Sequence, residues 1–423
     1  MPDSPAAPRT SAAAPSAARP DAQPTLADLT TLRVGGDVDT YVEAASEAEL
    51  IDVVRSADDV GEPLLMLGGG SNLLVADEGF GGVVVKDVRT GLRVESEDTC
   101  GGASMSGPAG HSWDDVVVQA IDAGWVGVEA LSGIPGTLGA APVQNIGAYG
   151  QEVAGGISTV RVWDRGEARV RTFANGELGF GYRTSRLKRS MHLGLAGYPG
   201  AAGAAAPGSF DTDPRAPWYP SPRYVVLDVS MQLRLGTLSA PVAYAELARR
   251  LGVGVGERAP SAEVRSAVLE LRGGKGMLLD PAVQDGRLVG RPDHDRWSAG
   301  SFFANPIVPA AVADDLPEGA PRFAVRSPLP AVSTGPSLGA VDPTLVKTSA
   351  AWLIEHAGFG KGFGVAGEAG PARLSTRHTL ALTNRGGATA ADLVALARAV
   401  RDGVRERFGI ELEPEPVLVG VSL

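Results

Sequence analysis

Four short stretches of the sequence carry residue types that can bind or transform a ligand. Three consecutive glycines, Gly68–Gly70, stand in LGGGSNLLV before a serine and an asparagine. Such a run marks either a loose surface turn or a turn whose backbone N–H groups surround a phosphate. FGYRTSRLK contributes Arg183, AGSFFANP contributes Ser301 and LEPEP contributes Glu415. These stretches add a cation, a hydroxyl and a carboxylate from distant parts of the chain.

A fifth stretch, GIPGTLGAAPVQNIGAYG at residues 133–150, is rich in glycine and alanine and carries no charged residue. Small side chains let the backbone approach a large flat ligand closely. Taken singly, the other candidates also have structural interpretations. Ser301 reads as a turn serine after Gly300, and Arg183 reads as a surface arginine at the end of a strand.

Strands and helices alternate in the first part of the chain, from Leu26. TYVEAAS alternates as a strand does, and Ser46 with Glu49 predicts a capping box at the start of a helix. PLLMLGGGSNLLV is a buried strand that runs into the glycine turn, and GFGGVVVKD is a second strand. A dinucleotide fingerprint of the doubly wound fold needs a helix after its glycine turn, so that fold is disfavoured.

The second part predicts the helix HSWDDVVVQAIDAG and the strands STVRVWD, RVRTFA and RYVVLDVSMQLRL. Residues 196–222 form a Pro/Gly/Ala-rich insertion, which predicts a long mobile loop with Tyr198 and Tyr219 in solvent. The third part predicts two helices, a loop over about residues 316–343, a helix from Thr389 to Phe408 and a terminal strand. The expected division is a disordered tail at 1–24, units at 25–95, 96–236 and 237–410, and a C-terminal strand at 411–423.

Composition excludes several classes of protein. The formal charge of −11, from 38 basic and 49 acidic residues, argues against a surface that coats DNA. The single cysteine, Cys100, precludes an internal disulfide and fits a reducing compartment. The five histidines lack metal-ligand spacing, so no metal is expected. The first 24 residues lack the apolar core of a signal peptide and no run of 18 apolar residues occurs, so we expect neither a signal peptide nor a membrane span.

In combination, these motifs resemble the UDP-N-acetylenolpyruvoylglucosamine reductases of bacterial peptidoglycan synthesis, FAD enzymes of the vanillyl-alcohol-oxidase type. The resemblance covers roughly residues 26–420, in order, and is specific at LGGGSNLL, PGTLGAAPVQNIGAYG, FGYRTS, AGSFFANP and LEPE. It implies an α+β fold in which a two-part FAD-binding domain precedes an α+β substrate-binding domain. The implied reaction is the NADPH-dependent reduction of UDP-N-acetyl-enolpyruvoylglucosamine to UDP-N-acetylmuramate.

The resemblance also implies roles for individual residues. The family's enol-stabilising arginine falls on Arg183, its proton-donating serine on Ser301 and its assisting acid on Glu415. Its substrate contacts fall on Tyr149, Tyr244, Lys275 and Asn305. Its FAD contacts fall on Leu67, Gly68, Gly69, Gly70, Ser71, Asn72, Ile134, Pro135, Gly136, Gly139, Asn145, Gly147, Ala148 and Gly150.

Two stretches depart from the family pattern. The family follows its glutamate with valine and arginine, whereas this chain has EPVLVG, and GGKGMLLD replaces the shorter Lys-Leu-Pro form around Lys275. The proline after Glu415 favours an extended backbone there, which suits a terminal strand.

The expected partners are the UDP-sugar and NADPH, with no nucleic acid and no membrane, and the expected state is a cytoplasmic monomer. Two alternatives stay open: an FAD-dependent alcohol or sugar oxidase of the same fold, and a non-catalytic nucleotide-binding relative. The serine and glutamate favour the reductase over the oxidase, because an oxidase needs a base rather than a proton donor.

Overall fold

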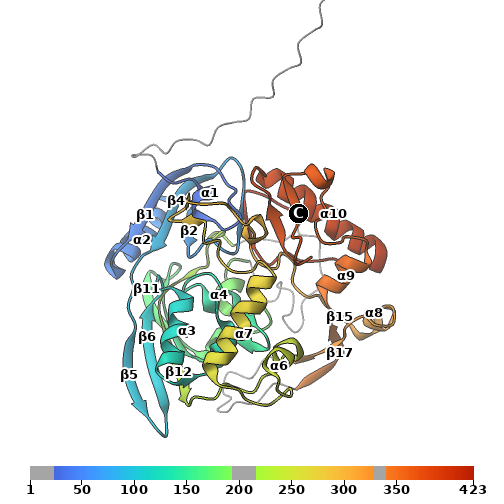
Figure 1. Cartoon of the computed structure of the whole chain (residues 1–423). Helices are drawn as coiled ribbons and strands as arrows, with labels where there is room; N and C mark the ends of the chain where they lie inside the picture. Colours follow the sequence, from blue (N-terminus) through green and yellow to red (C-terminus); the bar gives the residue numbers. More distant parts are fainter. Residues whose placement is uncertain (1–22, 193–215, 327–339) are drawn as a thin grey trace, which may run out of the picture.

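The computed structural model describes residues 23–192, 216–326 and 340–423. Most of the predicted tail and residues 196–215 of the predicted insertion therefore lie outside the described residues. Figure 1 shows a blue N-terminal unit above a sheet coloured cyan to green, with an orange-to-red C-terminal unit beside both. None of the helices within these ranges is both long and apolar enough to cross a bilayer.

The N-terminal unit is a small parallel sheet covered by a helix. Its elements are α1 (Leu26–Leu29), β1 (Val38–Ala44), α2 (Glu47–Val60), β2 (Leu64–Leu67), β3 (Leu73–Val75) and β4 (Phe80–Asp87). The strand order is β1-β4-β2, and α2 packs Leu50 and Val54 against Val83 and Val85 of β4. The two strands predicted on either side of the glycine turn are therefore present.

The predicted capping box at the start of α2 forms only in half. The Ser46 hydroxyl accepts a hydrogen bond from the Glu49 N–H at 3.2 Å, as expected. The Glu49 carboxylate, however, accepts from the N–H of Ala45 at 2.8 Å and not from that of Ser46. The reciprocal bond thus falls one residue before the cap.

The second unit is an antiparallel sheet with a helix on its inner face. Its elements are β5 (Arg93–Asp98), β6 (Gly102–Pro108), α3 (Trp113–Asp122), β7 (Trp125–Val126), α4 (Ala141–Gln144), β8 (Gly147–Ala148), β9 (Gln151–Glu152), β10 (Ile157–Asp164), β11 (Arg169–Ala174), α5 (Arg186–Arg189) and β12 (Tyr224–Leu235). The sheet order is β11-β10-β12-β6-β5, with β7 beside β12. Trp113, Val116 and Val117 of α3 are fully buried in the core with Met105 and Val229 of the sheet.

The third unit runs along the second and then builds a separate core. Its elements are α6 (Ala245–Leu251), α7 (Ser261–Gly274), β13 (Val283–Gln284), β14 (Arg287–Leu288), β15 (Ile307–Pro309), α8 (Ala310–Asp314), β16 (Phe323–Arg326), β17 (Val341–Lys347), α9 (Ala350–His356), β18 (Ala372–Leu374), β19 (Leu382–Asn384) and α10 (Ala390–Phe408). Thr389 caps α10 and Gly409 ends it in the left-handed conformation, so the predicted helix is confirmed. Its apolar stripe is fully buried in the core of this unit.

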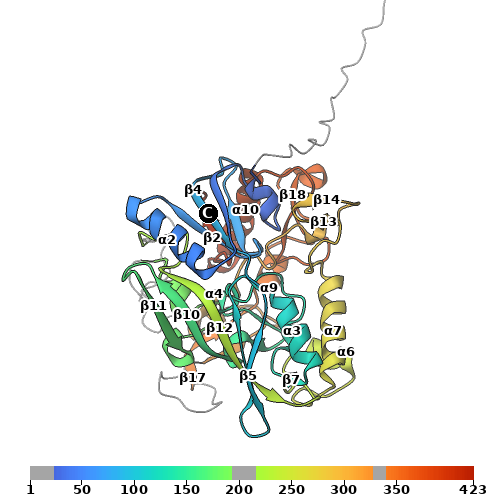
Figure 2. The same cartoon turned by 90° about the vertical axis from the view of Figure 1, so that its left-hand side faces the viewer.

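Helix α7 attaches this unit to the second one. Figures 1 and 2 both show α7 beside α3. Arg265 of α7 donates two hydrogen bonds, of 2.7 and 2.8 Å, to the carboxylate of Asp114 at the start of α3. The ion pair joins the N-terminal half of α7 to the start of α3.

The last strand, β20 (Val417–Val419), returns to the N-terminal unit. It pairs in parallel with β3, matching Val417 to Leu73 and Val419 to Val75. The Asn72 carboxamide also donates to the backbone oxygen of Glu415 at 3.3 Å. This pairing brings the end of the chain next to the glycine turn.

Two predicted loops are more ordered than the sequence suggested. Within the predicted loop over 316–343, Phe323–Arg326 forms β16 and pairs with β17. Because β16 is largely exposed, its side chains carry no alternation that would mark a strand. Near the end of the insertion, Tyr219 donates to the backbone oxygen of Leu418, so its prediction as a solvated residue is wrong.

Candidate active site

A cavity of about 330 Å³ lies where the three units meet. Its walls are the glycine turn after β2, the loop before α4, the segment carrying Arg183 and Lys188, the end of α7, Arg296 with residues 298–301, and Glu415. Arg183, Ser301 and Glu415, the three predicted catalytic residues, therefore line one cavity. In the sequence, 232 residues separate Arg183 from Glu415.

Two glycine turns form one wall without side chains. A Cβ on Gly69 would lie 2.7 Å from Gly136 Cα, and a Cβ on Gly70 would lie 1.9 Å from the backbone oxygen of Leu29. Gly70 also has a φ of +61°, which favours glycine. The Ser71 hydroxyl donates to Pro135 O at 3.0 Å and ties the two turns together.

The glycine turn leaves hydrogen-bond donors for a ligand. In the part of the chain that the structure describes, the backbone N–H groups of Gly69, Gly70 and Ser71 donate to no acceptor. Successive unpaired N–H groups in a turn form an anion-binding concavity. A cradle without side chains, with unpaired N–H groups, fits a dinucleotide such as FAD, whose pyrophosphate is anionic.

Eleven of the fourteen residues predicted to contact FAD line the cavity. The other three are Asn145, Ala148 and Gly150, of which Asn145 is fully buried. The Asn145 carboxamide donates to the Glu152 carboxylate and to Gly181 O, both at 2.9 Å, and accepts from Ala154 N–H. The structure thus gives Asn145 a role inside the protein that holds two turns together.

Arg183 and Glu415 form an ion pair at the cavity wall. Arg183 Nε lies 3.3 Å from the Glu415 carboxylate, and Arg183 Nη2 donates to Gly147 O at 2.9 Å. Burial lowers the pKa of Arg183, but the charges of Glu415 and the nearby Tyr182 raise it by more. The net shift of the Arg183 pKa is therefore upward. The guanidinium therefore stays cationic within a largely desolvated site.

Backbone pairing with the segment that follows Ser301 positions Glu415 for its ion pair with Arg183. Glu415 N–H donates to Phe302 O at 2.8 Å, and Ala304 N–H donates to Glu413 O at 3.0 Å. A bridge between Phe303 and Pro414 lies between these two bonds. The two segments that carry the predicted serine and glutamate are thus paired through their backbones.

Ser301 itself is half-buried and lines the cavity. It follows Gly300, whose φ is +72°, and precedes Phe302 and Phe303, which are each only 1% exposed. The Ser301 hydroxyl makes no hydrogen bond to another described residue. The hydroxyl is therefore available to a bound ligand.

Lys188 and Gln144 complete a hydrogen-bonded chain to Glu415. Lys188 Nζ donates to Gln144 Oε1 at 2.7 Å and to Glu415 O at 3.3 Å, and Gln144 Nε2 donates to Glu415 Oε2 at 3.2 Å. A protonated lysine only donates, so it fixes the carboxamide with its NH₂ toward the carboxylate. Burial lowers the pKa of Lys188 to about 8.

Three of the predicted substrate contacts gather outside the cavity wall. Tyr149 and Tyr244 meet edge to face with ring centroids 5.7 Å apart, and Lys275 Nζ lies 5.6 Å from the Tyr149 ring centroid. Lys275 also donates to Glu246 Oε2 at 2.6 Å. Burial lowers the pKa of His378 to about 4, with the charges of Lys275 and Lys361 adding to the shift.

The fourth predicted substrate contact, Asn305, lies apart from these residues. Its Oδ1 accepts from the N–H of Ala350, the first residue of α9, at 2.9 Å. Its backbone N–H donates to the Tyr182 hydroxyl at 3.4 Å. Half of the Asn305 carboxamide is therefore used to hold α9.

Sequence reasoning missed several cavity residues, among them Gln144, Lys188 and Arg272. Arg272 is 9% exposed and donates to Gly133 O and Met277 O, and burial lowers its pKa to about 10. Each of these three lies within five positions of a predicted residue. Because charged and amide side chains are ordinarily solvated, only this proximity could have indicated them.

No cluster of three or more His, Cys, Asp or Glu that could hold a metal occurs within the described ranges. The cavity is instead lined by glycine, apolar and cationic groups, with Glu415 and Asp87 as its acids. This lining suits an anionic organic ligand better than a metal ion.

Comparison with known proteins agrees with this geometry. Residues 38–172 match the model of an FAD binding domain, and residues 291–419 match the model of the UDP-N-acetylenolpyruvoylglucosamine reductase C-terminal domain. A protein of Cutibacterium acnes with the same reductase name is 50% identical over 398 residues, covering 94% of this chain and 90% of that protein. A namesake from Nocardia farcinica is also 50% identical, covering 94% of this chain and 89% of that protein.

A solved structure of the corresponding reductase from Thermus caldophilus has the same fold. It is 24% identical, covers 93% of this chain and 97% of its own, and superposes with a TM-score of 0.52. The predicted fold class, an FAD-binding domain followed by an α+β domain, is confirmed. With half of its residues identical to those relatives over nearly its whole length, the chain belongs to the UDP-N-acetylenolpyruvoylglucosamine reductase family.

Proposed function

We propose that this protein uses NADPH and FAD to reduce UDP-N-acetyl-enolpyruvoylglucosamine to UDP-N-acetylmuramate. The observation that carries the proposal is the meeting of Arg183, Ser301 and Glu415 at one cavity that the two glycine turns also line. Family membership supports the same reaction. Through this product the enzyme would serve peptidoglycan synthesis, and with it cell shape and division.

The two glycine turns would hold the cofactor. The unpaired N–H groups of Gly69–Ser71 suit the pyrophosphate, and the glycine-rich loop before α4 suits a flat ring. FAD, when bound, supplies the hydride chemistry that reduction of a carbon–carbon double bond requires. We assign residues 25–95 and 96–236 to FAD binding, 237–410 to the substrate and 411–423 to the strand that carries Glu415.

Arg183 would stabilise the negative charge that develops on the enolpyruvyl carboxylate side. Glu415 holds its Nε and Gly147 O holds its Nη2, whereas Nη1 has no partner among the described residues. A cation fixed before the reaction costs no reorganisation when charge appears. Glu415 acts here by orienting the guanidinium.

Ser301 would give its proton to the C2 carbon of the enolpyruvyl group. Serine is a weak acid, so this step needs a dry site and a nearby positive charge. The buried rings of Phe302 and Phe303 exclude water on one side, and Arg183 lines the same cavity.

The outer residues Tyr149, Tyr244 and Lys275 would bind the UDP part of the substrate. An ammonium and two hydroxyl-bearing rings suit a diphosphate and a base. Asn305 would contribute through the amide nitrogen that the contact with Ala350 leaves over. We further propose a cytoplasmic monomer that binds no nucleic acid, in keeping with the charge of −11.

The test is NADPH oxidation by the purified protein with and without the enolpyruvyl sugar nucleotide. We expect a yellow protein whose flavin absorption bleaches under NADPH without air and returns on addition of the substrate. NADH in parallel measures the nicotinamide preference. Fast return of colour with air alone would indicate an oxidase, and a protein that never takes up flavin would contradict the proposal.

A further inference from the structure

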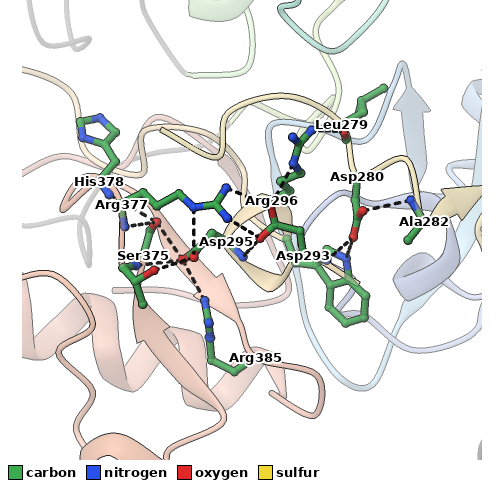
Figure 3. A network of polar contacts seen from close by, with 12 residues as sticks. Leu279, Asp280, Ala282, Asp293, Asp295, Arg296, Ser375, Arg377, His378 and Arg385 are labelled. Atoms are coloured by element: carbon green, nitrogen blue, oxygen red, sulfur yellow. Dashed lines mark hydrogen bonds and ion pairs between the residues drawn. The ribbon is translucent and has the colours of Figure 1, made fainter. Parts of the chain in front are cut away.

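Asp295, six residues before Ser301, lies at the centre of a polar network that the reaction described above does not use (Figure 3). Asp295 is buried, with 5% of the residue exposed. It accepts hydrogen bonds from Ser375 Oγ at 3.0 Å, Thr376 N–H at 2.8 Å, Thr376 Oγ1 at 2.6 Å and Arg385 Nη1 at 2.9 Å. One side chain thereby joins the loop after β14 to the turn between β18 and β19.

Two neighbouring aspartates extend this network toward the end of α7. Asp293 accepts from Arg296 Nε at 3.1 Å and from Arg377 Nη1 at 2.9 Å. Asp280 accepts from Asp293 N–H and from Trp297 Nε1, each at 3.0 Å. Three segments, at 279–282, 293–297 and 375–385, are therefore held in one arrangement.

The chain that leaves this network leads directly into the cavity. Arg296 and residues 298–301 line the cavity wall. After Asp295, two further hydrogen bonds hold the segment 296–301. Asn384 N–H donates to Trp297 O at 3.0 Å, and Thr31 Oγ1 donates to Ser298 O at 2.7 Å. Asp295 is the one charged side chain of residues 295–303 that binds this loop to the β18–β19 turn through several bonds.

The turn after Lys275 also rests on Asp295. A Cβ on Gly276 would lie 2.8 Å from the backbone oxygen of Asp295. The backbone N–H of His378, whose side chain lies near Lys275, shares the Ser375 hydroxyl with Asp295. The loop of Ser301 and the outer residues around Lys275 are thus positioned against the same residue.

Stability alone does not explain a buried carboxylate at this place. Desolvation of a buried ion pair offsets much of its attraction, so apolar residues of similar volume often stabilise a fold as well or better. A fully satisfied polar network instead specifies one geometry. Burial raises the pKa of Asp295, but hydrogen bonds from Thr376 and Ser375 and the charge of Arg385 lower it by more, which keeps the acid ionised.

We propose that Asp295 is a positioning residue, which holds the loop 296–301 so that Ser301 can give its proton to the substrate. This inference rests on the proposed function. Asp295 touches neither substrate nor cofactor in this account, and it acts through the backbone between itself and Ser301.

The test is Asp295→Asn in the full-length holoenzyme, with each half-reaction measured separately. Small displacements of a reacting group cost about 10-fold to 100-fold in rate. We expect the limiting rate of flavin reoxidation by the enolpyruvyl substrate to fall by about that factor. The limiting rate of flavin reduction at saturating NADPH should stay near wild type, because that step needs no proton from Ser301.

Hydrogen exchange gives a readout that does not depend on activity. In the Asp295→Asn holoenzyme, amides of residues 296–303 should exchange faster, while those of the glycine turn at 68–72 should be unchanged. Thr376→Val removes one donor to Asp295 with little change of shape and should behave in the same way. Thr376→Ser keeps the hydroxyl and should restore the wild-type pattern.

Asp164→Asn is the matched control. Asp164 is also buried and also binds two arginines, Arg171 and Arg223, but it lies at the end of β10 and does not line the cavity. We expect it to lower thermal stability without separating the two half-reactions. Equal slowing of both half-reactions in Asp295→Asn, or no slowing, would overturn the proposal. If the enolpyruvyl substrate did not reoxidise the reduced flavin of the wild-type enzyme, the proposed function itself would be refuted.

Discussion

The cavity wall and the outer residues around Lys275 both carry charged side chains, but they hold them in different ways. At the wall, the side chains of Arg183 and Glu415 are 23% and 12% exposed, bind each other, and are held further by Gly147 and Gln144. In the outer group, Lys275 and Glu246 are 28% and 37% exposed and bind each other across two helices. Buried charges interact strongly and keep fixed directions, whereas exposed pairs contribute little and exchange partners easily.

This difference indicates a division of labour. Fixed charges at the wall suit a transition state, since they need no rearrangement when charge develops. A half-exposed lysine beside two tyrosines suits a ligand that must arrive, bind and leave. Substitutions at the wall should therefore change rates, and substitutions in the outer group should change affinities.

The largest effect is expected for Ser301→Ala. Without the hydroxyl, the substrate half-reaction should slow by about 10²–10⁴, the range for loss of a general acid. Flavin reduction by NADPH should stay near normal, because it does not use this proton. Rapid-mixing absorbance of the flavin measures both rates on one sample.

Ser266→Ala, on the exposed side of α7, is the control and should match wild type in both half-reactions. If Ser301→Ala slowed the two half-reactions equally, the serine would be structural, and the distinction between wall and outer group would lose its main support.

A smaller effect, about 10-fold, is expected for Lys188→Met in the substrate half-reaction. The change removes hydrogen bonds to Gln144 and Glu415, and one hydrogen bond to a charged group is worth about 1.5 kcal/mol. The Gln144 carboxamide would then be free to flip and withdraw its NH₂ from the Glu415 carboxylate.

The pH dependence sharpens this test. The pKa of Lys188 is lowered to about 8, so the ammonium that fixes Gln144 is present below pH 8 and is lost above it. The wild-type substrate half-reaction should slow as the pH rises through about 8, and Lys188→Met should lack that step. Arg186→Met is the control. Arg186 lies on the same short helix as Lys188, but its guanidinium stacks over the Phe173 ring instead of binding Glu415. A pH step that persisted in Lys188→Met would belong to another group.

The fold could be predicted where short-range signals determine structure. The α10 helix shows this, with a capping threonine, an apolar stripe and a terminal glycine, and so does the glycine turn between β2 and β3. Strand β16 could not be predicted, because pairing with β17 stabilises it rather than its own side-chain pattern.

In the candidate site too, residues within local motifs could be predicted, whereas residues that depend on long-range contacts could not. Motifs indicated Arg183, Ser301 and Glu415, and the structure brings all three to one cavity. The contact of Lys188 with Glu415 spans 227 residues and leaves no trace in local sequence. Asp295 was missed for the same reason, since its partners lie 80 to 90 residues further along the chain.

The smallest effect is expected for Lys275→Ala. Loss of a half-exposed ammonium should weaken binding of the UDP substrate by about 10-fold, equivalent to about 1.4 kcal/mol, with FAD still bound. The limiting rate of the substrate half-reaction should change little, because Arg183 and Ser301 stay in place. Titration of the flavin spectrum with the product UDP-N-acetylmuramate measures affinity without turnover. Arg55→Ala removes a more exposed pair with Asp52 on α2, far from the outer group, and should leave the affinity unchanged. A fall in limiting rate as large as that of Ser301→Ala would mean that the outer group takes part in the chemistry, and the contrast between the two regions would fail.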